Sequence, residues 1–336
     1  MMMKVALVHT TSQIGHHGCT LVNRRIEALS AAAGLQITRR FPLQFDETAE
    51  DWGRYDAILL NGEGSLHHDR RAAKRIAALG GVFERAGRPA YLINTIYEEN
   101  GPEVAEGVAR YRRVYTRDGA SQAALARAGI AAIVVPDLSL TWEPGTALAP
   151  KGGRLVVGDS VHKHVSAALW GFARAKHAPF FSMMTTPPVI PDFADRNRKH
   201  RLRHAWRRAT GLVSPKGATR ARFWNEFKSF EDYTAFLAKS AALVVTGRFH
   251  QLCIGFDMEI PVVAVSSNTR KLESLCADAG IAGRVVPTAA EAAALVEREG
   301  LSGLAYTPDE IANLRRFRAG ARDRAAAMFR TIAGGG

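Results

Sequence analysis

The chain has 336 residues, of which 47% are hydrophobic and 23% charged. This length and composition predict two buried cores of roughly 150 residues each and exclude collagen-like or wholly disordered chains. The three separated cysteines, Cys19, Cys253 and Cys276, exclude a disulfide framework and favour a reducing compartment. No signal peptide and no long apolar run is visible, so we expect a cytoplasmic protein.

The net charge of +13 is concentrated in one segment, because residues 196–222 carry ten Lys/Arg and no acidic residue. Such a segment is typical of nucleic-acid contact, of attraction to an anionic membrane surface, or of a solvated insertion. No nucleic-acid-binding fold surrounds it, so we expect no nucleic-acid partner. Attraction to the inner face of a membrane and a solvated insertion both remain open.

Short apolar runs alternate with segments of helical period, a pattern that predicts parallel sheets built from βαβ units. The predicted strands of the first half are Val5–His9, Leu35–Phe41, Ala57–Asn61, Ala90–Asn94, Val114–Thr116 and Ala132–Val135. The predicted helices between them are Thr20–Ala33, Arg70–Ala86 and Ser121–Ala128. Together they predict an N-terminal Rossmann-like domain over residues 1–145.

A stretch rich in Pro and Gly, Glu143–Gly153, is the predicted linker to a second domain over residues 154–310. Its predicted strands are Leu155–Gly158, Phe180–Met184, Ala242–Thr246, Val262–Val265 and Ile281–Val286. Its predicted helices are Val165–Lys176, Phe230–Ser240, one near Leu252–Phe256, Thr269–Ala279 and Ala289–Glu299. We expect a basic insertion at 195–222, and a C-terminal helix followed by a disordered tail over 311–336. Two Rossmann-like domains facing a central cleft would bind a ligand at the carboxyl ends of their strands.

Glycines and polar residues follow the first and third predicted strands. Gly15, His17 and Gly18 lie in a loop that leads into a helix, where free backbone N–H groups suit an anion. A plain capped loop is the alternative. After the third strand, Glu63 lies between Gly62 and Gly64 and is a candidate acid, base or sugar-hydroxyl ligand. A hydrogen bond that orders the loop is the alternative there.

The same loop continues into His67-His68-Asp69, whose residue types are those of metal ligands. Adjacent histidines point apart, and no matching third cluster follows, so we expect no metal.

Charged residues follow two further strands. Arg117 and Asp118 follow one, with Asp137 shortly after, and a buried structural pair of Arg117 with Asp118 is the alternative to a functional role. Later in the chain, Arg248 and His250 follow another strand. Arginine grips phosphate or carboxylate with two N–H groups, and histidine supplies a proton near neutral pH.

The geometry around Arg248 and His250 depends on the backbone. If the segment stays extended, the two side chains share one face. Gly247 precedes them, and Arg270 and Lys271 open the next helix. The alternative to a functional pair is that His250 is a core histidine and Arg248 a surface arginine.

Taken in order, these segments resemble the polysaccharide pyruvyl transferase family over roughly residues 5–280. The matching residues are Arg117-Asp118-Gly119-Ala120-Ser121, Pro136-Asp137, Thr246-Gly247-Arg248-Phe249-His250, Pro261 and Lys271. Two segments depart from the family pattern. His16-His17-Gly18-Cys19 lacks the carboxylate of the family's first loop, and Asn61-Gly62-Glu63-Gly64 replaces its triple glycine.

The resemblance implies a transferase of GT-B-like arrangement that needs no cofactor and uses phosphoenolpyruvate as co-substrate. The acceptor would be a sugar of a surface polysaccharide or lipid-linked glycan, bound by the N-terminal domain, with the donor on the C-terminal domain. The donor-binding residues would be Arg248, Lys271, Arg117, Gly247 and Arg270. His250 would be the acid, Glu63 or Asp137 would act on the acceptor hydroxyl, and the acceptor or anion loops would contain Gly15, His17, Gly18, Gly62 and Gly64.

A nucleotide-sugar-dependent glycosyltransferase of the same two-domain kind is the alternative. Arg248 and Lys271 would then hold a diphosphate, and Glu63 would be the base.

Overall fold

The computed structural model describes residues 2–150, 152–185 and 227–336, together with six residues between 198 and 209. Apart from these six residues, the basic insertion predicted at 195–222 lies outside the described part of the chain. The chain divides into two compact units. The first contains Met1–Thr11, Asn23–Thr141 and Ala319–Gly336, and the second contains Ser12–Val22 and Trp142–Arg318.

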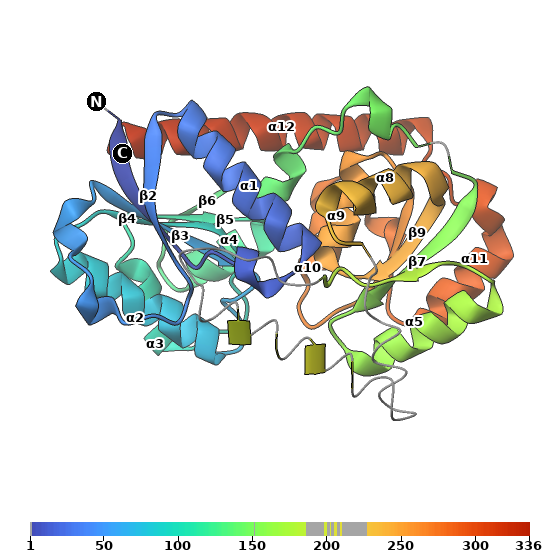
Figure 1. Cartoon of the computed structure of the whole chain (residues 1–336), viewed down its shortest axis with the longest axis horizontal. Helices are drawn as coiled ribbons and strands as arrows, with labels where there is room; N and C mark the ends of the chain where they lie inside the picture. The colour runs from blue at the N-terminus through green and yellow to red at the C-terminus, as the bar shows by residue number, and fades with distance from the viewer. Residues whose placement is uncertain are drawn as a thin grey trace. The chain divides into compact units, whose positions relative to one another are not determined.

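The first unit contains a six-stranded parallel sheet in the order β2-β1-β3-β4-β5-β6 (Figure 1). The strands are β1 Met3–Val8, β2 Leu35–Phe41, β3 Ala57–Glu63, β4 Ala90–Thr95, β5 Arg113–Thr116 and β6 Ala132–Val134. Strands β3 and β4 are buried along their whole length, which explains their continuous apolar runs. The helices α2 Arg71–Arg85 and α3 Pro102–Ala109 pack side by side, and α4 Gly119–Arg127 joins β5 to β6.

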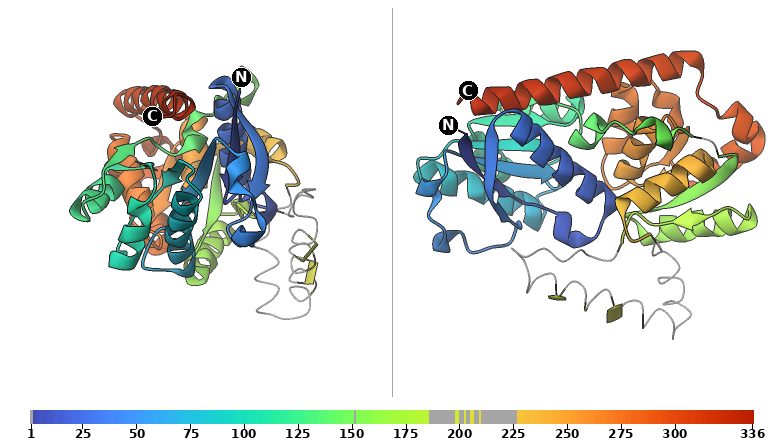
Figure 2. Two further views of the ribbon diagram at one scale, coloured as in Figure 1. Left: turned by 90° about the vertical axis from the view of Figure 1, so that its left-hand side faces the viewer. Right: turned by 45° about the horizontal axis from the view of Figure 1, so that its top comes forward.

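The second unit contains a five-stranded parallel sheet in the order β11-β10-β9-β7-β8. The strands are β7 Arg154–Ser160, β8 Phe180–Phe181, β9 Ala241–Gly247, β10 Val262–Val265 and β11 Val285–Val286. The helices are α5 Lys163–Ala175, α8 Phe230–Ser240, α9 Phe249–Asp257, α10 Lys271–Asp278 and α11 Ala289–Gly303. Helix α5 lies beside β7, both light green in Figure 2. The helices α1 His17–Ala32 and α12 Pro308–Ala333 contribute residues to both units.

Each sheet has one point where the order of its strands reverses. In the first sheet this point lies between β1 and β3, and in the second it lies between β7 and β9. Open parallel sheets bind ligands at the carboxyl ends of the strands that flank such a point. The predicted fold class of two Rossmann-like α/β domains is confirmed, while the central cleft stays a prediction.

Three element boundaries differ from the predicted ones in ways that matter for the site. Helix α1 begins at His17 rather than at Thr20. Strand β3 runs on to Glu63, so part of the predicted glycine-rich loop is strand. Helix α9 begins at Phe249, directly after Arg248 in an extended conformation, so the condition under which Arg248 and His250 would share one face is not met.

Two elements outside the site also differ from the predictions. The short helix α3 was not predicted, and only Val285–Val286 of the predicted strand Ile281–Val286 is a strand, because residues 282–284 form a single 3-10 turn. At the C-terminus, Gly334 and Gly335 donate backbone hydrogen bonds to the end of α12, where disorder was predicted. None of the described helices combines the length and apolar character needed to cross a bilayer.

Candidate active site

Three neighbouring strands of the first sheet end in residues with an unusual backbone. His9 follows β1 with a φ of 62°, Glu63 ends β3 with a φ of 42°, and Asn94 lies near the end of β4 with a φ of 55°. The left-handed region costs a residue with a Cβ atom roughly 1–2 kcal/mol. Strain of this kind concentrates at functional sites. The three residues lie at the carboxyl edge of the sheet, beside the reversal point between β1 and β3.

The side chains at this edge form one buried hydrogen-bond network. The Nδ1 atom of His9 lies 2.6 Å from the carbonyl oxygen of Asn61. The Glu63 Oε1 atom accepts from the Thr11 hydroxyl at 2.7 Å and from the Asn61 amide at 3.4 Å. The Asn94 amide donates to Asn61 Oδ1 at 3.4 Å. Burial lowers the pKa of His9, and the nearby Glu63 carboxylate opposes that shift.

Arg117 and Asp137 form a buried ion pair close to this network. Arg117 Nη1 lies 2.7 Å from Asp137 Oδ2, and their side chains are only 3% and 0% exposed. Asp137 Oδ1 also accepts from the backbone N–H and hydroxyl of Ser139. Arg117 therefore pairs with Asp137 and not with Asp118, whose carboxylate caps α4 through the Ser121 N–H. Arg117 and Asp137 thus neutralise each other, and the buried pair has another partner than the Asp118 that the sequence suggested.

The β7/β9 reversal point of the second sheet contains a second ion pair. Arg248 donates to both carboxylate oxygens of Asp159, from Nε at 3.0 Å and from Nη2 at 2.6 Å. Asp159 also accepts from the Ser182 hydroxyl and the Met183 N–H, so its orientation is fixed. A guanidinium has five N–H groups, and Asp159 uses only one edge of it. The Arg248 side chain is 18% exposed, so it is held in place but still accessible.

His250 lies beside this arginine and packs against the start of α1. A Cβ atom built on Gly18 would lie 2.2 Å from Cβ of His250, so only glycine fits there. The backbone N–H groups of Gly18 and Cys19 point to Nδ1 of His16 at 3.1 and 3.3 Å. The His16 ring therefore caps α1, and these two N–H groups are already used. The predicted anion site at this loop stays a prediction.

Three histidines gather within this part of the second unit. The rings of His16 and His250 lie 5.6 Å apart, edge to face. Burial, and then the nearby His250 and Arg248, hold the pKa of His16 well below its usual value. Burial lowers the pKa of His17 to about 4, and its ring stacks on Tyr233 at 4.9 Å. His16 and His17 are thus neutral at pH 7.

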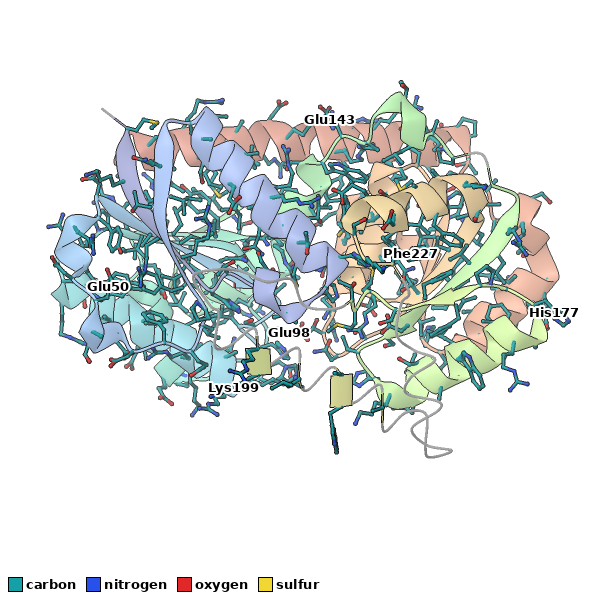
Figure 3. All side chains as sticks on the ribbon, in the orientation of Figure 1. Glu50, Glu98, Glu143, His177, Lys199 and Phe227 are labelled. Carbon is teal, nitrogen blue, oxygen red and sulfur yellow. The ribbon has the colours of Figure 1, made fainter. Side chains whose placement is uncertain are left out.

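Aromatic rings pack around Tyr233, which belongs to α8. Phe227, which is labelled in Figure 3, packs on Tyr233 with ring centroids 5.8 Å apart. It also packs on Phe181 and Phe236 at 5.0 and 5.1 Å. This packing holds the start of α8, and with it the ring that covers His17.

The remaining predicted residues have clear positions. Lys271 is the first residue of α10, after the strand next to β9, and its Nζ donates to Asn268 at 2.8 Å. Arg270 precedes it and is exposed. The other predicted residues are glycines at close packing points or in turns. A Cβ atom on Gly62 or Gly247 would clash with the neighbouring strand, Gly64 approaches Arg117 Nη2, and Gly15 has a φ of 72°.

The predicted residues are divided between the two units. Arg248 and His250 belong to the second unit, whereas Glu63, Arg117 and Asp137 belong to the first. The prediction missed four residues that the geometry singles out: His9, Thr11, Asn94 and Asp159. All four lie within three residues of the carboxyl end of a strand. That position is the signal that could have identified them.

Two groups of described side chains have the composition of a metal site. His16, Cys19 and His250 place ligand atoms within 4.8 Å of one another, as do His68, Glu98 and Glu99. In the first group, His16 Nδ1 already accepts from two N–H groups. In the second, His68 Nε2 lies 2.9 Å from a carboxylate oxygen of Glu99. Glu98 and Glu99 are the partners of His68 that the sequence did not reveal. The predicted absence of a metal stays a prediction.

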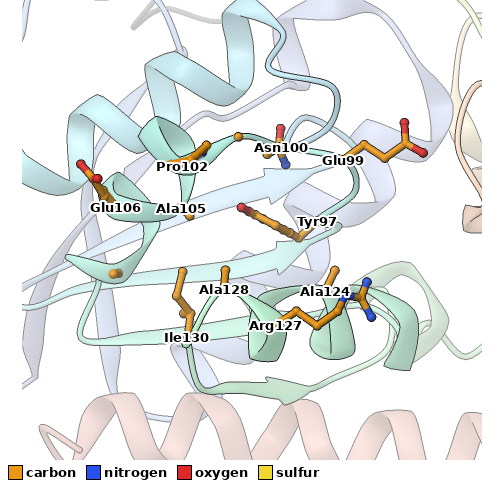
Figure 4. Close-up of a pocket in the computed structure, with 12 residues that line it drawn as sticks. Tyr97, Glu99, Asn100, Pro102, Ala105, Glu106, Ala124, Arg127, Ala128 and Ile130 are labelled. Carbon is orange, nitrogen blue, oxygen red and sulfur yellow. The ribbon is translucent and has the colours of Figure 1, made fainter.

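The first unit also has an open pocket of about 620 Å³ between α3 and α4 (Figure 4). Tyr97, Pro102, Arg127 and Ile130 are among its lining residues. None of the strand-end residues described above lines it, so this pocket is separate from the candidate site.

The chain has two α/β units, each built on a parallel sheet with a cluster of polar side chains at its strand-reversal point. This architecture is that of proteins with two Rossmann-like domains. UDP-GlcNAc 2-epimerase from Neisseria meningitidis, bound to UDP-GlcNAc, is similar at 10% identity over 96% of this chain and 100% of that one, with a TM-score of 0.53. A putative UDP-N-acetylglucosamine 2-epimerase from Listeria monocytogenes shares 12% identity over 98% and 96% of the two chains, with a TM-score of 0.51. A glycotransferase of kitacinnamycin shares 10% over 99% and 98%, also at 0.51. Identities this low show the fold alone.

The family is shown by a different comparison. The model of the polysaccharide pyruvyl transferase family matches residues 6–269, which is most of the chain. The chain belongs to this family and is a transferase. A comparison with curated proteins gave no match.

Proposed function

We propose that this transferase moves the pyruvyl group of phosphoenolpyruvate onto two hydroxyls of a sugar in a surface polysaccharide or lipid-linked glycan. The family membership supports the proposal. The observation that carries it is the guanidinium of Arg248, held by Asp159 at a strand-reversal point, with His250 two residues further on. A fixed cation beside a proton donor suits a substrate with two anionic groups and a carbon to be protonated.

The chemistry assigns each group a task. The two acceptor hydroxyls lose their protons and form two bonds to C2 of the donor. One proton is gained at C3, which becomes a methyl group, and the other leaves with inorganic phosphate when the bond between C2 and the phosphate oxygen breaks. In this proposal Arg248 and Lys271 hold the donor anions, His250 protonates C3, and Glu63 acts on an acceptor hydroxyl. Arg117 and Asp137, which neutralise each other, are given a structural role.

The test combines donor binding with turnover. Phosphoenolpyruvate should raise the melting temperature of the wild-type chain, because ligand at 100 times its Kd stabilises by about 2.7 kcal/mol. Phosphate release with a panel of glycosides should follow, and Arg248→Ala should lose both signals. As a control, Arg127→Ala changes a pocket residue away from the strand ends and should retain both. Full activity of Arg248→Ala would refute the assignment.

The second candidate is a nucleotide-sugar-dependent glycosyltransferase, which the fold of the similar glycotransferase supports. Arg248 and Lys271 would then bind the diphosphate. A thermal shift with UDP-sugars and none with phosphoenolpyruvate would favour this candidate.

We also propose that residues 195–222 draw the protein to an anionic membrane surface, where lipid-linked acceptors are found. The charge of the segment supports this, since each Lys/Arg near such a surface contributes about 1 kcal/mol.

A further inference from the structure

The ring of His9 is fixed by a hydrogen bond whose direction is unambiguous. Its Nδ1 atom lies 2.6 Å from the backbone carbonyl oxygen of Asn61. A carbonyl oxygen only accepts, so Nδ1 carries the hydrogen. In the neutral imidazole the lone pair then lies on Nε2. The ring is neutral at pH 7 because burial lowers the pKa of His9. His9 therefore presents a base at the end of β1.

The backbone holds this ring at the reversal point of the sheet. Val8 pairs with Leu60, so His9 lies next to Asn61 on the adjacent strand. His9 adopts the left-handed region despite its side chain, as do Glu63 and Asn94 on the two following strands. Three residues with positive φ thus lie side by side at the edge where open parallel sheets bind ligands.

The chemical character of this edge selects a class of ligand. Glu63 contributes a carboxylate and His9 a ring lone pair, whereas the Asn94 amide is already used by Asn61 and by the Leu138 N–H. The neighbouring Arg117 is paired with Asp137, which neutralises its charge. Acceptor groups of this kind bind hydroxyl donors and repel phosphate. The edge thus fits a neutral polyol such as a sugar.

We propose that His9 is the general base that takes the proton of an acceptor hydroxyl, and that Glu63 stabilises the imidazolium formed. The hydroxyl O–H bond breaks, its oxygen forms the new bond to the donor carbon, and the proton moves to Nε2 before passing to solvent. The nature of the donor rests on the function proposed above, whereas the base does not depend on it. This replaces Glu63 as the base and leaves it a positioning residue.

The first experiment reads the tautomer directly. The full chain is labelled with 15N-histidine, and His9→Gln assigns the His9 signals in long-range 1H–15N spectra. We expect the Nδ1–H tautomer in the wild-type chain at pH 7.5. The Nε2–H tautomer, or an imidazolium, would overturn the proposal, because neither has a lone pair at Nε2.

The second experiment reads the reaction. General-base catalysis contributes roughly 10²–10⁴-fold, so His9→Ala should lower kcat by at least 100-fold while KM for phosphoenolpyruvate changes less than threefold. Added imidazole should restore part of the activity of His9→Ala, which a purely structural role does not allow. As a matched control, His164→Gln changes an exposed histidine and should behave like the wild-type chain.

The outcomes separate this inference from the proposed function. If the wild-type chain uses phosphoenolpyruvate and the kcat of His9→Ala stays within threefold of the wild-type value, His9 is not the base, whereas the proposed pyruvyl transfer is unaffected. If the chain uses only a nucleotide sugar, and His9→Ala loses activity that added imidazole restores, His9 is the base and the assignment of phosphoenolpyruvate as donor is wrong.

Discussion

Arg248 and Asp159 are joined by two parallel hydrogen bonds across the strand-reversal point of the second sheet, at 3.0 and 2.6 Å. The pair links the ends of β7 and β9, 89 residues apart in sequence. Because Asp159 is fixed by Ser182 and Met183 as well, the arginine has a defined orientation before any ligand arrives. Such preorganisation lowers the entropy lost on binding.

Asp159→Asn tests whether this orientation matters. The amide has nearly the same shape but loses the charge and one acceptor, so the guanidinium is no longer held on both sides. We expect kcat/KM for phosphoenolpyruvate, measured by phosphate release, to fall at least tenfold, which corresponds to about 1.4 kcal/mol. Ser182→Ala removes two neighbouring hydrogen bonds, to Asp159 and from the Met184 N–H, but keeps the ion pair, and should stay within threefold of the wild type. Equal losses in both variants would contradict an orienting role for the charge.

Gly18→Ala tests the contact between α1 and His250. The added methyl group would lie 2.2 Å from Cβ of His250, so one of the two must move. Overpacking of this kind costs typically 1–3 kcal/mol, and we expect a loss of that size in the free energy of unfolding in urea. Gly171→Ala is the matched control, because Gly171 lies within α5 with open space around it and should gain up to about 1 kcal/mol. A Gly18→Ala variant as stable as the control would show that the α1 contact is not tight in solution.

Much of the fold could be predicted from periodicity, because both sheets are buried and their strands are continuous apolar runs. Helix α8 and strand β10 have the predicted boundaries. Helix starts were harder to predict. The N-terminal cap of α1 is a histidine ring, and Arg248 precedes α9 without any side-chain cap, so neither start carries the usual Ser, Thr, Asp or Asn.

The candidate site was predicted only in part, for a physical reason. Arg248 and Glu63 were identifiable because each is a charged residue next to a glycine at the end of a buried strand, and His250 because it follows Arg248 by two residues. His9 and Asp159 stand within or directly at the end of apolar runs, where a single sequence does not separate a packed residue from one that faces a ligand. Their partners, Asn61 and Arg248, become visible only when the register of the strands is known.

The pH dependence of stability should carry a contribution from His17. Burial lowers its pKa from 6.5 to about 4 in the folded chain, so the unfolded chain binds the proton more readily. The contribution of His17 to stability is therefore complete above pH 6.5 and is lost as the pH falls toward 4. At pH 4.5 the loss amounts to about 2 kcal/mol.

His17→Phe separates this effect from that of the carboxylates. Phenylalanine retains the stacking on Tyr233 but has no titrating group. We expect the difference between the unfolding free energies at pH 7 and pH 4.5, measured in urea, to shrink by about 2 kcal/mol in the variant. If the difference is the same in both chains, His17 is not buried as a neutral ring.

The last prediction concerns the basic segment, residues 195–222. Its ten Lys/Arg in residues 196–222 should bind the full chain to vesicles of phosphatidylcholine and phosphatidylglycerol, and not to phosphatidylcholine alone. Binding should weaken strongly between 50 and 500 mM salt, because the Debye length falls from roughly 14 to about 4 Å over that range. A chain lacking residues 195–222 should lose vesicle binding yet retain phosphate release with a soluble glycoside, since the strand-end residues are untouched. Co-sedimentation with vesicles measures the binding. If the segment is only a solvated insertion, its deletion leaves vesicle binding unchanged, and that result would refute its proposed role in membrane binding.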